Sequence, residues 1–183
     1  IVVISGDGSL QYSNIRSNDE EFIQLKIDNL SVEEINSIIQ IEFNDDGNFL
    51  LVWSATFVGI IEFPTANSAT QPTKSSFNLR EDILKYSTVF EFKNRTDIKQ
   101  TSIQQVKFHH LNNQFIVILC ETDYLFLVDL VTYEEQRIRL SGDIKFVSFT
   151  FGTDLDWLKL TIFLISTNNS VYCLCPIIPK RTV

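Results

Sequence analysis

Apolar and polar residues follow one pattern that occurs four times along the chain. Each copy has an apolar or alternating run, a short polar turn, and a second run rich in β-branched and aromatic residues. This order is typical of a β-hairpin. The sequence therefore predicts hairpins at 1–12, 48–63, 114–130 and 160–175, with turns at 6–8, 54–56, 121–123 and 166–169.

The four predicted hairpins are regularly spaced. Their second strands begin at Ser9, Phe57, Tyr124 and Ser170, so successive copies are 48, 67 and 46 residues apart. Short strands at 39–43, 106–108 and 146–151 precede three of them. A four-strand unit with this period is typical of β-propeller blades, whereas a β-sandwich has no such period. The sequence predicts an all-β chain that forms a partial β-propeller, about three to four blades of a larger one.

The longest of the three spacings predicts a polar insertion at about 64–100. Residues 65–76 have the low hydrophobicity of a loop, and 84–92 has the pattern of an outer strand. Residues 31–34 read Ser-Val-Glu-Glu, a capping box that predicts one helical turn before the strand at 39.

Composition and charge narrow the class of protein. With 44% hydrophobic residues, the 183-residue chain can bury a sizeable core. Its net charge of −8 argues against direct nucleic-acid binding, which needs clustered basic residues. Arg137 and Arg139 alternate with apolar residues, as solvent-facing strand positions do. No apolar run approaches the roughly 18 residues of a membrane span, so membrane insertion is not expected.

The cysteines and histidines are the first candidates for chemistry. Cys173 and Cys175 are two residues apart on a predicted strand, and Cys120 lies far from them, which is not a disulfide framework and fits a reducing compartment. Zinc prefers Cys-x-x-Cys on a turn, and His109 and His110 would point in opposite directions on a strand. A Cys-His nucleophile would need a third, orienting group. The sequence favours buried thiols that act as small apolar packing groups.

The acidic pairs carry no clearer signal for catalysis. Asp154 and Asp156 follow Gly152, and Asp45-Asp46-Gly47 forms a second acidic turn, but neither matches a calcium loop, and Asp is a common turn residue. Phosphate loops, nucleophile elbows and His-Glu-x-x-His motifs are absent from the sequence. We therefore assign no catalytic, cofactor-binding or metal-binding residue and expect no enzyme activity, no cofactor and no small-molecule substrate. The partner-binding residues stay unassigned.

Two segments resemble a known family. The first reads Phe-Thr-Phe-Gly at 149–152, followed by Trp157, Thr161 and a strand that ends in Tyr-Cys-Leu-Cys-Pro-Ile-Ile-Pro at 172–179. It resembles the closing portion of the N-terminal propeller of the nucleoporin eighty-eight family, called nucleoporin eighty-two in yeasts. The second, 106–130, resembles an earlier blade of that family, with His110 where proline is common and Tyr124 in place of a smaller residue.

The resemblance carries expectations about fold, place and partners. It implies that residues 1–183 are a fragment of one N-terminal β-propeller, with a C-terminal coiled coil beyond it. It implies a structural component of the nuclear pore complex on the cytoplasmic face, in support of mRNA export and protein transport between nucleus and cytoplasm. The implied partners are other nucleoporins: the C-terminal domain of the nucleoporin ninety-eight family and the C-terminal tail of the nucleoporin two-hundred-fourteen family.

Two other interpretations stay open at the level of the sequence. A generic WD-like propeller adaptor for signalling or trafficking would share the fold, although the chain lacks the Gly-His and Trp-Asp dipeptides of WD repeats and the paired glycines of kelch repeats. A secreted propeller hydrolase or lectin would use the glycosylation sequons at Asn29, Asn94 and Asn168.

Overall fold

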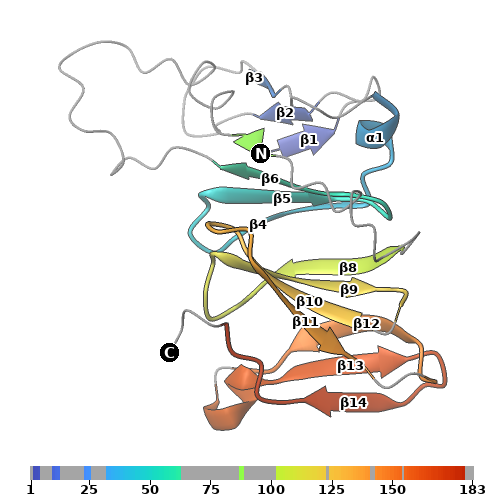
Figure 1. Cartoon of the computed structure of the whole chain (residues 1–183). Helices are drawn as coiled ribbons and strands as arrows, with labels where there is room; N and C mark the ends of the chain where they lie inside the picture. Colours follow the sequence, from blue (N-terminus) through green and yellow to red (C-terminus); the bar gives the residue numbers. More distant parts are fainter. Residues whose placement is uncertain are drawn as a thin grey trace. The chain divides into compact units, whose positions relative to one another are not determined.

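The computed structural model describes residues 2–4, 10–12, 23–25, 32–62, 87–88, 102–122, 124–140, 143–153 and 155–179. The chain divides into two compact units, Ile1–Phe92 and Lys93–Val183, which we describe separately. Antiparallel strands make up almost all of the regular structure in both units (Figure 1).

The described residues of the first unit form two antiparallel sheets and one short helix. The sheets have the strand orders β1-β2-β3 and β4-β5-β6-β7. Their strands are β1 (Val2–Ile4), β2 (Leu10–Tyr12), β3 (Ile23–Leu25), β4 (Gln40–Phe43), β5 (Phe49–Trp53), β6 (Val58–Glu62) and β7 (Ser87–Thr88). The helix α1 (Val32–Asn36) precedes β4 and confirms the predicted helical turn, while Ser31 of the capping box lies outside the described residues.

The described residues of the second unit also form two antiparallel sheets, with the orders β11-β10-β9-β8 and β12-β13-β14. Their strands are β8 (Ile103–Phe108), β9 (Phe115–Cys120), β10 (Tyr124–Asp129), β11 (Glu135–Arg139), β12 (Phe146–Phe151), β13 (Ile162–Ser166) and β14 (Val171–Leu174). A 3₁₀ helix, η2 (Asp156–Leu160), joins β12 to β13. In each sheet the strands pair in the order of the chain, which is the arrangement of propeller blades.

The predicted strands are confirmed. The four hairpins are β1–β2, β5–β6, β9–β10 and β13–β14, and β4, β8 and β12 are the strands predicted before three of them. Strand β7 lies inside the predicted outer strand at 84–92, while the rest of the insertion at 64–100 lies outside the described residues. Two elements are additions to the prediction, namely β3 and η2.

A hydrophobic core lies between the two sheets of the second unit, which Figure 1 shows as adjacent layers. Alternate residues of a strand point to opposite faces, so one face of each sheet can supply this core. The buried residues come from β9 and β10 on one side and from β12 and β13 on the other, and the core also includes Leu140 and Ile177 from the connecting segments. They are Phe115, Val117, Leu119, Leu125, Leu127, Leu140, Phe146, Phe149, Ile162, Leu164 and Ile177.

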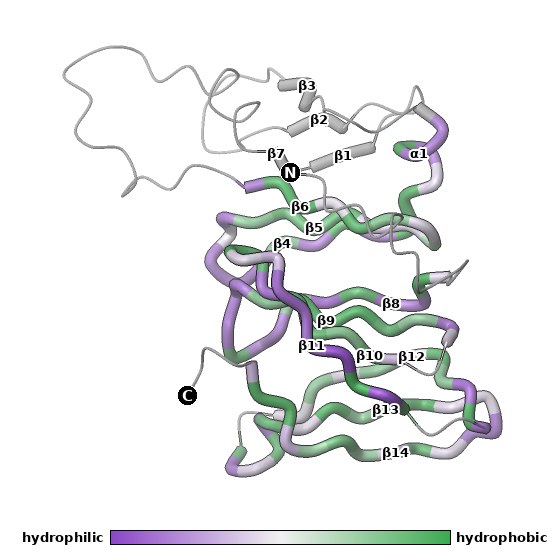
Figure 2. Tube along the Cα trace, viewed as in Figure 1, coloured by the Kyte–Doolittle hydropathy of each residue, from purple (hydrophilic) through white to green (hydrophobic). Residues whose placement is uncertain are grey.

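Strands β9 and β11 show how position in a sheet shapes the sequence. Every residue of β9 is buried, which explains its unbroken apolar run. Strand β11 is the outer strand, and Figure 2 shows it mainly in hydrophilic colours. Arg137 and Arg139 are exposed on it, as predicted, and the guanidinium of Arg137 lies 5.4 Å from the ring centre of the buried Phe126. A cation over an aromatic face is favourable, so Arg137 covers the ring at the solvent boundary.

The Asp45-Asp46-Gly47 segment forms the β4–β5 turn, as predicted. Gly47 has a φ of 68°, a left-handed conformation that glycine adopts at little cost. The Gly47 N–H donates to the Asn44 carbonyl at 2.9 Å, and the Phe49 N–H donates to Asn44 Oδ1 at 2.9 Å. Both aspartates are exposed beside these bonds, consistent with a role in the turn. Within the described part of the chain, no helix is long and apolar enough to cross a membrane.

Candidate functional site

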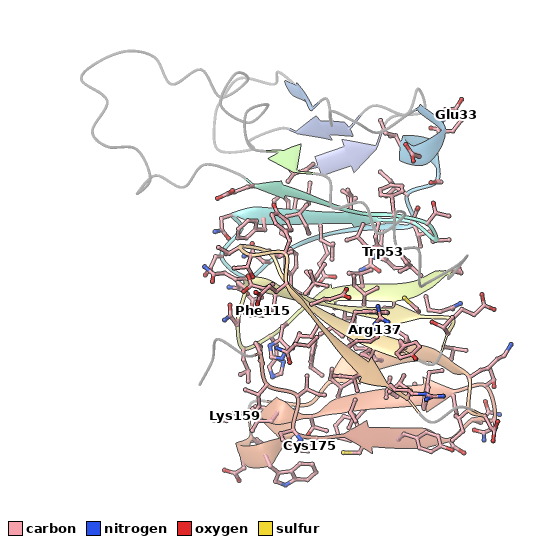
Figure 3. All side chains as sticks on the ribbon, viewed as in Figure 1. Glu33, Trp53, Phe115, Arg137, Lys159 and Cys175 are labelled. Carbon is pink, nitrogen blue, oxygen red and sulfur yellow. The ribbon has the colours of Figure 1, made fainter. Side chains whose placement is uncertain are left out.

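The structure corrects the interpretation of the Cys-x-Cys pair. Cys173 and Cys175 are both exposed, whereas Cys120 is buried. The prediction that all three thiols are buried packing groups is therefore right for Cys120 and wrong for the other two. Strand β14 ends at Leu174, so Cys175 lies just beyond it (Figure 3). Its Sγ lies 3.9 Å from the Trp157 carbonyl oxygen.

The position of β14 in its sheet explains why the prediction failed. β14 is the edge strand of a three-stranded sheet, and its burial alternates along the strand. Tyr172 and Leu174 pack against the core, while Val171 and Cys173 belong to the other face. That second face is apolar and open to solvent, with Val147, Ile165 and Val171 exposed on it. An apolar strand sequence alone does not say whether a second layer covers it.

The thiols offer a direct test of this arrangement. Burial raises the pKa of Cys120 to about 12 from its ordinary value of 9.0, so its reactive thiolate is about a thousandfold rarer than that of an ordinary thiol. We expect Cys173 and Cys175 of the folded chain 1–183 to react with a thiol reagent at pH 8, and Cys120 to react only after denaturation. Titration with Ellman's reagent, before and after denaturation, measures this.

Two serine variants serve as controls for the thiol titration. Cys173→Ser and Cys175→Ser should each remove one fast-reacting thiol and leave the slow one unchanged. Rapid reaction of Cys120 in the native protein would contradict the burial of β9.

The two histidines lie together rather than apart. Strand β8 ends at Phe108, so the pair begins the β8–β9 turn, and the alternation of a strand does not apply. The two rings stack with centroids 5.3 Å apart and planes 20° apart. The ring of Phe151 in β12 packs against both, with its centroid 5.2 Å from that of His109 and 4.8 Å from that of His110. We name His109, His110 and Phe151 the histidine cluster.

His109 joins three segments of the second unit. It is buried, and its Nδ1 accepts a hydrogen bond from the Leu111 N–H at 3.3 Å. The proton of the neutral ring is then on Nε2, and the ring also bonds to the backbone of Ile177. The pKa of His109 is lowered from 6.5 to about 4, mainly by burial and also by neighbouring His110, while the bond to Ile177 opposes both effects. His109 is therefore neutral at physiological pH.

Within the described ranges, no three side chains of His, Cys, Asp or Glu come together as metal ligands do. Asp156 begins η2, whereas Asp154 lies outside those ranges. Asn168 occupies the β13–β14 turn, where its Oδ1 accepts hydrogen bonds from the Ser166 hydroxyl and from the Ser170 N–H.

One surface feature was missed from the sequence. Trp157 on η2 is 57% exposed and Leu155 is 67% exposed. The backbone below them is fixed, because the Trp157 carbonyl accepts a hydrogen bond from the Thr161 hydroxyl at 3.0 Å and the Leu160 carbonyl accepts one from the Ile177 N–H at 2.8 Å. A tryptophan in the sequence usually indicates a core residue, so composition alone gave no signal for its exposure.

Comparison with known proteins gives a short sequence match. The nuclear pore complex protein NUP88 of Arabidopsis thaliana is 39% identical over 50 residues, which make up 27% of this chain and 6% of that protein. No family model matches the sequence.

Two solved complexes give the structural match. A chain of the yeast heterotrimeric Nup82-Nup159-Nup116 nucleoporin complex superposes with a TM-score of 0.60 at 16% identity, covering 97% of this chain and 40% of that one. A chain of the Chaetomium thermophilum complex of the Nup82 N-terminal domain, the Nup159 tail and Nup145N gives a TM-score of 0.55 at 17% identity, covering 78% of this chain and 32% of that one.

These matches decide the fold and not the activity of the whole protein. The chain spans less than half the length of the relatives that it matches. The predicted all-β, partial β-propeller fold is confirmed. The chain is therefore a partial β-propeller similar to those of the Nup82/Nup88 type, and the resemblance seen in its sequence is confirmed.

Proposed function

We propose that this chain is a structural component of the nuclear pore complex, a non-enzymatic propeller scaffold of the nucleoporin eighty-eight/eighty-two family. The observation that carries the proposal is the superposition of 97% of the chain on a chain of a nucleoporin complex, joined to the 39% identity with NUP88 over 50 residues. The fold alone would fit many functions. The sequence match in the same family makes the nuclear pore the best supported of them.

The proposed mechanism is surface recognition by a rigid scaffold. The two matching complexes contain Nup159 together with Nup116 or Nup145N, and these partners are consistent with the two nucleoporin families expected from the sequence resemblance. We propose that the chain docks nucleoporins of these kinds on the cytoplasmic face of the pore and so supports mRNA export and protein transport. Rigid blades that present loops and edges bind partners with little loss of conformational entropy.

We further propose that residues 1–183 are a fragment of one larger propeller, with its polar insertion at about 64–100 and a coiled coil beyond the fragment. Two observations support the proposal that the chain is a fragment of a larger propeller. Among the described residues, the sheet β12-β13-β14 has three strands, whereas β8–β11 form a sheet of four with the same order. Its outer face exposes Val147, Ile165 and Val171, and apolar surface of this kind is normally covered by another layer.

Binding of the expected partners tests the proposal. We expect the full-length protein to co-elute in gel filtration with a purified Nup159-type tail and with a Nup145N-type domain. Failure of both partners to bind would contradict the nucleoporin proposal and would favour a generic propeller adaptor.

Two single substitutions in β12 test whether binding depends on the folded propeller. Phe149→Ala removes a core side chain of the second unit and should weaken binding that depends on the fold. Thr150→Ala changes the next residue, which is exposed, and should leave binding unchanged. Loss of the fold in the Phe149→Ala protein is checked by circular dichroism. Binding by an unfolded Phe149→Ala protein equal to that of the wild type would indicate adhesion that does not need the folded propeller.

A further inference from the structure

The segment 175–179 follows β14 and closes one end of the second unit. The Ile177 N–H donates to the Leu160 carbonyl of η2 at 2.8 Å. The Ile177 side chain is buried in the core between the two sheets. On the other side, the backbone of Ile177 bonds to His109 in the β8–β9 turn. One residue thus ties η2, the core and the β8–β9 turn together.

The histidine cluster holds the His109 ring in place, and this ring is bonded to the segment 175–179. His109 has a hydrogen-bonded partner on each side, Leu111 and Ile177, so the neutral ring is fully used. His110 is different, because both of its ring nitrogens are buried and neither has a partner among the described residues. Its ring is stacked on His109 and tilted against Phe151. His110 therefore adds no hydrogen bond that would stabilise a charge in the cluster.

The surroundings of the cluster do not compensate a positive charge. No Asp, Glu, Lys or Arg occurs in the three segments around the cluster, which are the turn 109–114, the end of β12 with the residues after it (149–153), and the segment 175–179. Apart from the two histidines, the ionisable group in these segments is the Cys175 thiol. On η2, to which Ile177 is bonded, the charged residues are Asp156 and Lys159, and both are exposed. Within these segments, His110 is the ionisable group that acts on His109. Each histidine would repel a proton placed on the other.

We propose that the stacked His109–His110 pair is an acid-sensitive latch that holds the segment 175–179 against the β8–β9 turn. A proton on His109 Nδ1 removes the acceptor of the Leu111 N–H and places a buried charge beside His110. The turn then moves to bring the ring into water, and the bond to Ile177 breaks. The segment and its buried Ile177 side chain separate from the end of the sheets, while the strands stay paired.

The direction of the pH effect follows from proton linkage. The pKa of His109 is about 4 in the closed segment and returns toward 6.5 when the ring meets water, so the open form binds more protons between these values. The latch is fully closed above about pH 6.5. Opening becomes up to about tenfold more favourable for each pH unit below that, and the effect levels off near pH 4.

Hydrogen exchange of the full-length protein tests the latch. The exchange rate of the amides in a peptide spanning 171–179 is measured at each pH from 7.5 to 4 and compared with the rate in the same peptide when unfolded. The ratio of the two rates removes the intrinsic pH dependence of amide exchange. We expect the protection of this segment to fall across the stated window. A peptide covering β9 should keep its protection over the same range, because the opening is local.

Two glutamine variants assign the effect to the histidines. His109→Gln keeps a donor and an acceptor but cannot be charged, so its 171–179 protection should be independent of pH. His110→Gln removes the repelling neighbour, so the pKa of His109 rises and the total loss of protection becomes smaller. The latch is refuted if His109→Gln and wild type give the same profile. It is also refuted if β9 and 171–179 lose protection in parallel in the wild type, a comparison that needs no variant.

Discussion

Replacing Phe149 with alanine is expected to lower the free energy of unfolding of the second unit by about 3–5 kcal/mol, the usual cost of removing a buried phenylalanine. Phe149 is 2% exposed and lies opposite Leu164 in the core between the two sheets. Its ring also meets Phe151 edge-on at 5.7 Å. Removing it leaves a cavity that fixed strands on both sides cannot fill.

Native-state hydrogen exchange across β12 and β13 measures the effect of this substitution. A loss of this size corresponds to about a hundredfold or more in protection, since about 1.4 kcal/mol is a factor of ten. Thr150→Ala is the matched control, because Thr150 is the next residue of β12 and is exposed. We expect it to change stability by about 0.5 kcal/mol at most. A larger loss in Thr150→Ala than in Phe149→Ala would mean that β12 is shifted by one residue, which would exchange its two faces.

The strands could be predicted because their signal is local. Strand β9 is apolar at every position, and β11 alternates charged with apolar residues, so each pattern reports burial directly. The polar turns between the runs fixed the hairpins, and the spacing of the hairpins gave the blades. The pattern gave no comparable signal for β3 or for η2, a single 3₁₀ segment.

The features that could not be predicted depend on residues far away in the sequence. Cys173 is exposed because no described residue covers the outer face of β14, although its own strand sequence is apolar. The histidine cluster needs Phe151 and Ile177, which are about 40 and 70 residues beyond the pair. A dipeptide of two histidines is equally compatible with a strand, where the rings would separate, and with a turn, where they can stack.

The Phe-Thr-Phe-Gly motif at 149–152, called the phrase below, shows how a sequence resemblance can reflect the packing of side chains. Phe149 is in the core. Phe151 lies on the same face of β12 and contacts both histidines. Gly152 ends the phrase at the point where the chain leaves β12 for η2, and its N–H donates to the Thr161 carbonyl at 2.9 Å. The phrase therefore contributes to three contacts: the core, the histidine cluster and the base of η2.

Gly152→Ala is expected to displace η2, because a Cβ at this position would lie 2.1 Å from the Leu158 carbonyl oxygen and 2.9 Å from its carbon. These are backbone atoms of a short helix whose ends are hydrogen-bonded, so they cannot rotate away as a side chain does. We expect a loss of about 3 kcal/mol, at the upper end of the usual cost of overpacking. The indole of Trp157 sits on η2, so its fluorescence should change together with the stability.

Two other glycines separate the cost of the backbone clash from the general cost of replacing a glycine. A Cβ at Gly59 would meet Val52 Cγ2 at 2.8 Å, the end of a side chain, so Gly59→Ala should cost less than Gly152→Ala. Gly47 has open space around it but a positive φ, a conformation that asparagine tolerates, so Gly47→Asn should cost under about 1 kcal/mol. Urea denaturation of the three variants should rank Gly152→Ala as the most destabilised. A Gly152→Ala protein as stable as Gly47→Asn would show that η2 does not rest on Gly152, and that the final glycine of the phrase needs an explanation other than close packing.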